Sequence, residues 1–250
     1  MGLGLAGCSY PTDTTPYPGV CVPMVITGSS PAVDSTGAPT NLVVKVRFAD
    51  YPDPDTVETT SMLLTTSVFR VPETYRVDLA AKTAIMTPVG PLVPLLGYTA
   101  SVFPGLRSLA GCSGPFRLLS FMTGDGPVDD PPVPPPTFAD LRPILDGHCA
   151  GNCHADASGG CLAAPAAGLS LCAPEARGAL VDVPSREVSS LRLVEPGDSA
   201  RSYLLRKVLP ATAGGRAVPT TLGQREPPGD PLTQAELATL TAWIDGGALP

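Results

Sequence analysis

The sequence predicts a two-domain chain in which an all-β sandwich precedes a proline-rich linker and a small all-α domain. Three observations carry this fold class. Short alternating apolar and polar segments fill residues 23–124, prolines crowd residues 125–136, and helix-start signals with helical periodicity occur in residues 137–250. Alternation with a period of two is typical of half-buried strands, and apolar spacings of three and four are typical of helices.

The composition excludes several classes of protein. The 250 residues carry a net charge of −7 and contain only 16 lysines and arginines. This balance argues against a nucleic-acid partner, because such binding needs clustered positive charge. No run of 18 apolar residues occurs in the sequence, so we predict no transmembrane helix.

Residues 1–22 are predicted to be a lipid-attachment site followed by a flexible tether. Leu5-Ala6-Gly7-Cys8 resembles a bacterial lipobox, in which a peptidase cuts before the cysteine and the thiol then carries lipid. The apolar stretch is short and lacks a basic flank, so the signal is either truncated or begins upstream of Met1. An ordinary Gly/Ala-rich terminus is the alternative. We expect an extracytoplasmic, membrane-anchored lipoprotein in the periplasm or at the cell surface, at the outer membrane.

Residues 23–124 contain about seven short segments with strand character, a number typical of a β-sandwich. The clearest is LVVKVRF at residues 42–48, where every second residue is apolar and the two charges fall between. Clusters of proline, glycine and aspartate separate the segments. The others occupy residues 62–71, 75–79, 84–87, 98–103 and 116–122. Cys21 and Cys112 bracket the stretch and are candidates for a disulfide.

A set of short motifs also follows a fixed order in this stretch. They are Ser30-Pro31, Gly37-Ala38-Pro39-Thr40, Arg47-Phe48, Met86-Thr87-Pro88, Pro91-Leu92, Gly97-Tyr98-Thr99, Leu109-Ala110-Gly111 and Phe121-Met122-Thr123-Gly124. Their order resembles a bacterial Ig-like domain of the S-layer (SbsA) type. The resemblance implies a spacer or adhesion module without catalytic residues.

Three helices are predicted after the linker, whose six prolines favour an extended, semi-rigid conformation. The first follows a capping-box pattern at residues 137–140 and is expected to place Pro143 at its first position. The second covers Ser199–Val208. The third begins at a capping box over residues 233–236 and stops at the glycine pair 246–247.

One short motif in the predicted helical domain indicates a cofactor site, and it consists of Cys149, Cys153 and His154. A c-type haem is held by thioether bonds from two cysteines, and the histidine that follows the second cysteine binds the iron. The usual spacing leaves two residues between the cysteines, whereas this chain has three, CAGNCH. We therefore expect covalent haem c, with His154 as the proximal iron ligand.

The residues around this pattern resemble the small cytochrome-c-like domains of anchored, multidomain bacterial proteins. The matching segments are Phe138 with residues 141–145, then 168–171, 194–198, 202–204, 227–228, 231–233, 236–237 and 242–248. The resemblance spans residues 137–249. It implies haem on Cys149 and Cys153, an axial His154, and a redox partner that the sequence does not identify.

One departure from this family concerns the sixth iron ligand. The family commonly has a methionine just before the Pro-Pro pair, and this chain has Glu226 there and no methionine after Met122. The sixth ligand is therefore unknown: the iron would be five-coordinate, bound to water, or bound to an unusual group. Loss of a thioether ligand should lower the reduction potential, which leaves both electron transfer and binding of a small haem ligand open.

Two other uses of the cysteines remain open. Cys161 and Cys172 flank a Gly/Ala-rich loop and are expected to pair in an oxidising compartment. In one alternative there is no haem and the chain forms two disulfides here, one between Cys161 and Cys172 and one between Cys149 and Cys153. Another is a zinc site made by Cys149, Cys153, His154 and Cys161.

The alternative function is a non-redox adhesion or scaffold lipoprotein with a disulfide-stapled helical domain. We do not expect an enzyme, since the sequence shows no nucleophile-elbow, Ser/His/Asp or phosphate-loop pattern.

Overall fold

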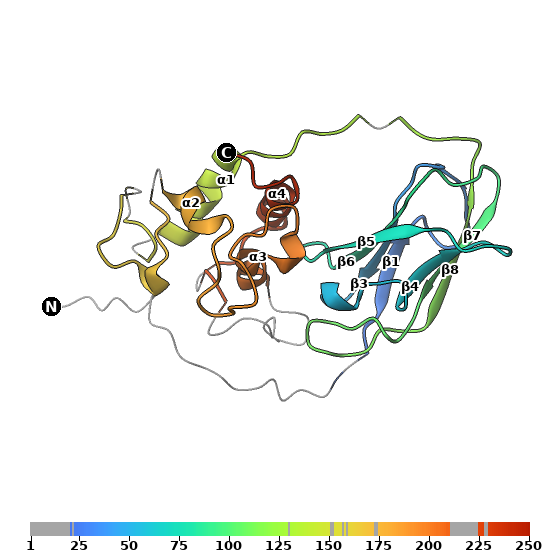
Figure 1. Ribbon diagram of the computed structural model, residues 1–250, viewed down its shortest axis with the longest axis horizontal. Coiled ribbons are helices and arrows are strands. Elements are labelled where there is room, and N and C mark those ends of the chain that lie inside the picture. Colours follow the sequence, from blue (N-terminus) through green and yellow to red (C-terminus); the bar gives the residue numbers. More distant parts are fainter. Residues whose placement is uncertain are drawn as a thin grey trace. The chain divides into compact units, whose positions relative to one another are not determined.

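The computed structural model describes residues 21, 23–129, 131–150, 153–156, 158, 160–172, 175–210, 225–227 and 230–250. These residues form two compact units, a β unit within residues 18–133 and a helical unit within residues 134–250 (Figure 1). The predicted lipid anchor at Cys8 and its tether lie outside the described residues. Among the helices described, none is both long and apolar enough to cross a membrane.

The β unit is a sandwich of two four-stranded sheets (Figure 1). One sheet has the order β1-β3-β6-β5 and the other β2-β8-β7-β4. All neighbouring strands are antiparallel except β2 and β8, which run parallel. The strands are β1 (Ile26–Ser30), β2 (Ser35–Ala38), β3 (Val44–Phe48), β4 (Met62–Thr65), β5 (Glu73–Asp78), β6 (Thr83–Pro88), β7 (Gly97–Val102) and β8 (Arg117–Thr123).

The alternation that predicted a strand at residues 42–48 places side chains as expected in β3. Val44, Val46 and Phe48 are buried, and the two charged residues between them are exposed. The five other predicted segments also contain strands. The sequence did not reveal β1 and β2, because ITGSS and STGA at the margins of the sheets carry almost no apolar residues to alternate.

A disulfide ties the start of the β unit to its later part. Cys21 and Cys112 are bonded, with their Cα atoms 5.2 Å apart. The Met24 N–H donates to the Ser113 carbonyl at 2.9 Å, so the two backbone segments run beside each other. The pairing left open by the sequence is therefore present.

The helical unit contains four α-helices, α1 (Phe138–Leu145), α2 (Ala176–Leu180), α3 (Tyr203–Val208) and α4 (Gln234–Asp245). Helix α1 begins at the predicted capping box, where the Thr137 N–H donates to Asp140 Oδ2 at 2.8 Å. Pro143 is the sixth residue of this helix rather than the first, so that prediction was wrong. The capping box fixes the start because it satisfies N–H groups that otherwise lack a partner.

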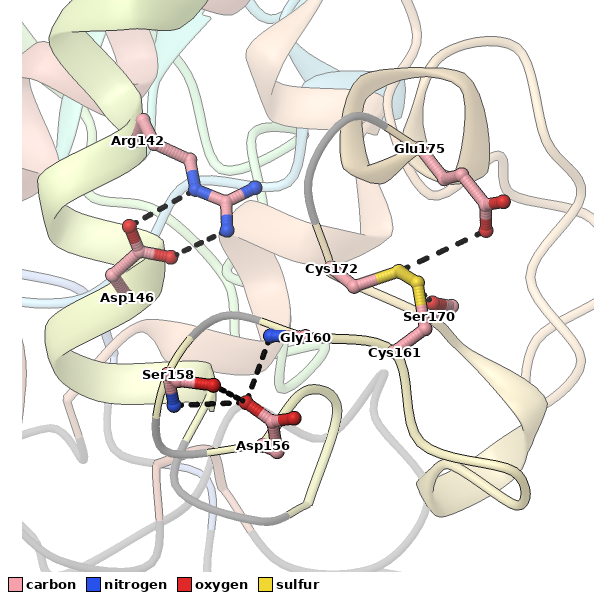
Figure 2. Close-up of a disulfide and its surroundings, with 9 residues drawn as sticks. All are labelled: Arg142, Asp146, Asp156, Ser158, Gly160, Cys161, Ser170, Cys172 and Glu175. Carbon is pink, nitrogen blue, oxygen red and sulfur yellow. Dashed lines mark hydrogen bonds and ion pairs between the residues drawn. A yellow bond between two sulfur atoms is a disulfide. The ribbon is translucent and has the colours of Figure 1, made fainter.

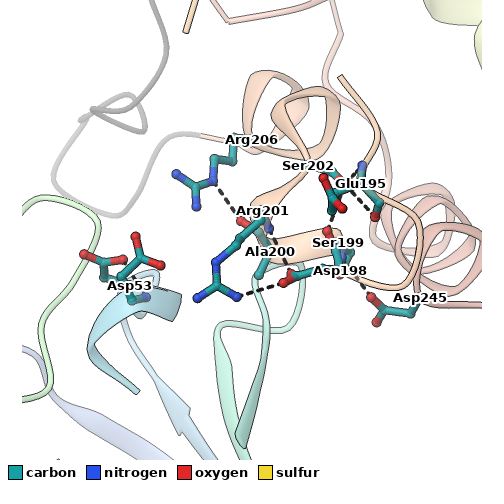
Figure 3. A network of polar contacts seen from close by, with 10 residues as sticks. Asp53, Glu195, Asp198, Ser199, Ala200, Arg201, Ser202, Arg206 and Asp245 are labelled. Atoms are coloured by element: carbon teal, nitrogen blue, oxygen red, sulfur yellow. Dashed lines mark hydrogen bonds and ion pairs between the residues drawn. The ribbon is translucent and has the colours of Figure 1, made fainter. Parts of the chain in front are cut away.

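The helix predicted over Ser199–Val208 is divided in two. A 3₁₀ turn covers Ser199–Arg201 and α3 starts at Tyr203, because Ser202 between them has an extended backbone. The Ser202 hydroxyl accepts from the Glu195 N–H at 2.8 Å and donates to the Asp198 carbonyl at 2.9 Å (Figure 3). Serine competes with helical hydrogen bonding in this way.

Helix α4 occupies the predicted position, and its buried side chains form part of the core of the helical unit. The Thr233 N–H donates to Glu236 Oε2 at 2.7 Å, and the helix ends at Asp245 with Gly246 as its C-cap. Trp243 is fully buried, lies 5.7 Å from the Phe138 ring of α1, and donates its indole N–H to the Leu249 carbonyl. Helices α1 and α4 therefore pack against each other at these two rings.

Removing the α4 cap should destabilise the helical unit. We expect Thr233→Ala to lower its free energy of unfolding by about 1 kcal/mol, because the N-terminal N–H groups lose their acceptor. Thr239→Ala is the matched control in the same helix, and it should be neutral or slightly stabilising because alanine is the better helix former. Denaturant unfolding followed by the fluorescence of Trp243, the single tryptophan, measures both. Equal midpoints for the two variants would contradict the assignment of the cap.

The two described disulfides should differ in their effect on stability. The bond between Cys21 and Cys112 closes 91 residues, whereas that between Cys161 and Cys172 closes 11. Chain entropy then predicts losses of about 4–5 and about 3 kcal/mol when each pair is replaced by alanine. Calorimetry of the two double variants measures the unfolding of the β unit and of the helical unit. A larger loss for the short loop would overturn this ranking.

Candidate functional site

A cavity of about 670 Å³ lies within the helical unit. Most of its lining is apolar, and its walls come from residues 147–149, 153–154, 167–169, 171, 179, 183–187, 193, 203–204, 207–208, 226–227 and 230. A cavity of this kind suits a small-molecule or cofactor ligand, for which volumes of about 300–1,000 Å³ are typical. Cys149, Cys153 and His154 all line it. The structure thus brings the three residues of the sequence motif to one site.

The motif is held in place by the end of α1 and by one backbone carbonyl. Helix α1 continues into a π-helical turn over Asp146–Ala150, which carries Cys149. The Ala150 carbonyl then accepts from the N–H groups of Cys153 at 2.9 Å, His154 at 3.4 Å and Ala155 at 3.2 Å. Ala150 and Ala155 are buried together with Cys172. The loop is therefore fixed on both sides of the motif.

The His154 ring is oriented by a hydrogen bond to a backbone carbonyl. Its Nδ1 lies 3.0 Å from the Leu169 carbonyl oxygen. A carbonyl can only accept, so Nδ1 carries the proton and Nε2 keeps a lone pair in the neutral ring. The His154 carbonyl in turn accepts from the Leu171 N–H at 2.9 Å. A hydrogen bond of this type orients a histidine ligand and raises its basicity.

Cys149 and Cys153 are in different chemical states. Cys149 is a free, half-buried thiol whose pKa is raised to about 12, chiefly by burial and secondly by the charge of Glu226. Cys153 is disulfide-bonded. Because Cys149 is free, the structure has no disulfide between Cys149 and Cys153, which was one of the alternatives left open by the sequence. A sulfur in a disulfide cannot also form a thioether, so haem attachment at Cys153 requires that this bond be opened first.

Cys161 and Cys172 form the second described disulfide, with Cα atoms 4.9 Å apart (Figure 2). The Ser170 hydroxyl lies 3.1 Å from the Cys172 sulfur, and a Glu175 oxygen lies 3.8 Å from it. Within the described residues, these cysteines and Glu175 are the only His/Cys/Asp/Glu group whose ligand atoms lie close enough to hold a metal. The set proposed for zinc, which combines Cys161 with Cys149, Cys153 and His154, is therefore not assembled.

Charged side chains on the cavity wall are mostly paired. Lys207 is buried, and its Nζ lies 2.8 Å from a Glu187 carboxylate oxygen to which the Tyr203 hydroxyl also donates. His148 Nε2 lies 3.1 Å from Glu236 Oε1. These contacts leave the two charges of the Lys207–Glu187 pair compensated. Neither the Lys207–Glu187 pair nor the His148–Glu236 pair could be predicted from the sequence, because the partners lie 20 and 88 residues apart.

Glu226 and Asp230 also line this cavity, and no side-chain partner among the described residues is found for either carboxylate. The Glu226 backbone N–H donates to the Lys207 carbonyl at 3.0 Å. Burial raises the pKa of the Glu226 carboxyl above the ordinary value, and the charges of Lys207 and His154 partly oppose this shift.

The Cys149 thiol should react slowly in the folded protein. With a pKa of about 12, its thiolate fraction near pH 8 is far below that of an unfolded cysteine, whose pKa is about 8.5. We expect alkylation by iodoacetamide to be at least about a hundredfold slower in the folded chain than in guanidinium chloride without reductant. Peptide mapping of the Cys149 modification measures both rates. Equal rates would show that this thiol is exposed.

Comparison with known proteins identifies the β unit. Residues 21–123 match the family model of a bacterial Ig-like domain. No curated protein matches the chain. Among solved structures, the N-terminal part of the bacterial S-layer protein SbsC is 18% identical, with 41% of this chain and 24% of that one covered and a TM-score of 0.34. The chain thus spans about a quarter of that protein fragment.

Two further solved structures, PcoC and a CopC, are similar to a share of this chain close to that matched by SbsC. PcoC, a copper resistance protein from Escherichia coli, is 15% identical, with 40% of this chain and 98% of PcoC covered and a TM-score of 0.31. CopC from Methylosinus trichosporium OB3b is 16% identical, with 43% and 97% covered and a TM-score of 0.34. The family match agrees with the Ig-like fold predicted for residues 23–124, and the β unit, residues 21–123, is a bacterial Ig-like domain.

Proposed function

We propose that the chain is an extracytoplasmic c-type haem protein whose helical unit is a cytochrome-c-like domain. The observation that supports this most is the cavity of about 670 Å³ with Cys149, Cys153 and His154 on its wall. In a form whose Cys153 is not in a disulfide, the protein would be anchored through lipid on Cys8 and would serve electron transfer or the binding of a small ligand at the haem. Haem supplies the iron chemistry, and the chain supplies binding, orientation and electrostatics.

The chain's own residues fit this group at two positions. His154 holds its proton on Nδ1 against the Leu169 carbonyl, which leaves Nε2 available as an axial ligand. Cys149 is a free thiol on the same cavity, as thioether formation requires. The apolar lining would exclude water from a bound macrocycle, which influences the potential of its iron.

The fit at Cys153 depends on redox state. Its sulfur is in a disulfide in the structure, so the disulfide-bonded form offers one thioether position and the reduced form offers two. We infer that the disulfide-bonded chain is a haem-free form. Covalent attachment through both cysteines would first need a dithiol reductant, which becomes a disulfide as the Cys153 bond is reduced to two thiols.

The β unit and the linker would act as a spacer. The β unit is a bacterial Ig-like domain with its own disulfide, and disulfides persist in oxidising compartments. The proline-rich composition of residues 125–136 favours a semi-rigid spacer. Together these features support an extracytoplasmic location in which the haem-binding unit is held away from its anchor.

The second candidate function is a non-redox adhesion or scaffold protein. Two observations favour it: the Ig-like domain matches a family model, and the Cys153 sulfur is engaged in a disulfide. In this case the helical unit is stapled by disulfides and its cavity holds no haem. The two functions predict different products when the chain is expressed with a haem-attachment system.

Expression with such a system tests the proposed function. We expect the wild-type chain to show the reduced spectrum of a c-type haem that survives denaturation. His154→Ala should lose the axial ligand and change that spectrum, whereas the matched control His148→Ala should keep it, because His148 bonds to Glu236 instead. Cys149→Ala should lose one thioether and shift the reduced band. A colourless wild-type protein that is fully folded would favour the scaffold function.

A further inference from the structure

Two polar side chains contact the same sulfur atom of the disulfide between Cys161 and Cys172. The Ser170 hydroxyl lies 3.1 Å from the Cys172 sulfur, and a Glu175 carboxylate oxygen lies 3.8 Å from it (Figure 2). This oxygen and the two sulfur atoms all lie within 4.8 Å of one another. We propose that the group is a site of thiol–disulfide exchange with a dithiol, an activity that does not depend on haem.

The exposure of the two cysteines sets the direction of attack. Cys161 is exposed, whereas Cys172 is fully buried. An external thiolate therefore reaches the Cys161 sulfur, and the Cys172 sulfur is the one that leaves. Exchange is faster when the leaving sulfur accepts the electron pair more readily. The Ser170 hydroxyl is placed to donate a hydrogen bond to that sulfur as negative charge develops on it.

Glu175 is placed to carry the proton that this exchange needs. A thiolate of the dithiol attacks the Cys161 sulfur, and the bond to Cys172 breaks. The electron pair of that bond moves to the Cys172 sulfur, which takes up a proton from water through Glu175. The second thiolate of the dithiol then attacks the mixed disulfide and releases Cys161, which is protonated by solvent. The dithiol loses two electrons and two protons and becomes a disulfide, while the chain gains two thiols.

The disulfide between Cys21 and Cys112 is an internal comparison. It also joins an exposed cysteine, Cys21, to a buried one. Within the described residues, however, the polar contact of the Cys112 sulfur is the Ala110 carbonyl, at 4.0 Å. A carbonyl has no proton to donate, so it gives the leaving sulfur no assistance. The two bonds therefore share their exposure and differ in the groups at the buried sulfur.

Reduction of the full chain by dithiothreitol, stopped by acid and read by alkylation and peptide mapping, tests the proposal. In the wild type we expect the bond between Cys161 and Cys172 to open at least about tenfold faster than the bond between Cys21 and Cys112. Glu175→Gln should slow the first bond at least about tenfold, through loss of proton transfer, and leave the second unchanged. Ser170→Ala should slow the first bond about fivefold, through loss of one hydrogen bond.

Asp182→Asn is the matched control for Glu175→Gln. Asp182 is an exposed carboxylate shortly after α2, and asparagine tolerates its positive φ. If Glu175→Gln opens as fast as Asp182→Asn, the proposal is wrong. Proton transfer also predicts equal slowing of opening and closure, so the equilibrium with a dithiothreitol redox buffer should stay within about twofold of wild type. An equilibrium that shifts as much as the rate would show that Glu175 only affects the stability of the bond.

Oxidised glutathione tests which sulfur is attacked. The Cys161 thiol of a Cys172→Ser chain should form a mixed disulfide with glutathione, whereas the Cys172 thiol of a Cys161→Ser chain should remain free. Equal labelling of the two thiols in folded chains would overturn the assignment. Circular dichroism shows whether each variant folds. If one does not, the position of glutathione on wild-type chains treated with reduced glutathione decides the same point, with Cys161 expected and Cys172 contradicting it.

Discussion

The hydrogen bond from His154 to the Leu169 carbonyl is the contact on which the candidate site depends. It sets the tautomer of the ring and its direction, and it joins the loop that carries the cysteine motif to the segment at residues 167–171. The Ala150 carbonyl, which accepts from three successive N–H groups, holds the other side of that loop. Together they present one histidine nitrogen to a cavity that is otherwise largely apolar.

The two cysteines of the motif are in different chemical states. In the structure Cys153 is disulfide-bonded and Cys149 is a half-buried thiol of raised pKa. A thiol of high pKa is a poor nucleophile, so Cys149 is protected from unwanted exchange in this state. The same arrangement leaves the cavity and His154 in place. Under the proposed function, the haem-free and haem-loaded forms would differ in the bonds that the Cys153 sulfur makes.

Sequence patterns predicted the strands and helices whose formation depends on interactions between residues close in the sequence. The alternation in β3 and the capping boxes at Thr137 and Thr233 were sufficient because burial and capping act over a few residues. Helix α2 was not predicted, since five residues give too few turns to show a period. The break at Ser202 also escaped, because it depends on a hydroxyl that bonds to Glu195 seven residues earlier.

The site was predictable in its residues but not in its assembly. CAGNCH pointed to Cys149, Cys153 and His154, and the cavity brings them together. The Leu169 carbonyl and the Lys207–Glu187 pair join segments that lie 15 and 20 residues apart, for which a single sequence has no signal. The disulfide state of Cys153 was not predicted for the same reason, since it depends on which sulfur comes near in the fold.

The intact mass of the protein, measured under denaturing conditions after secretion from a cell that matures c-type cytochromes, tests the central claim most directly. The account predicts a species heavier than the polypeptide by one haem, which loses the added mass when Cys149 and Cys153 are both replaced by alanine. A wild-type chain that remains at the mass of the disulfide-bonded polypeptide, in a cell that loads a known cytochrome in parallel, would contradict it.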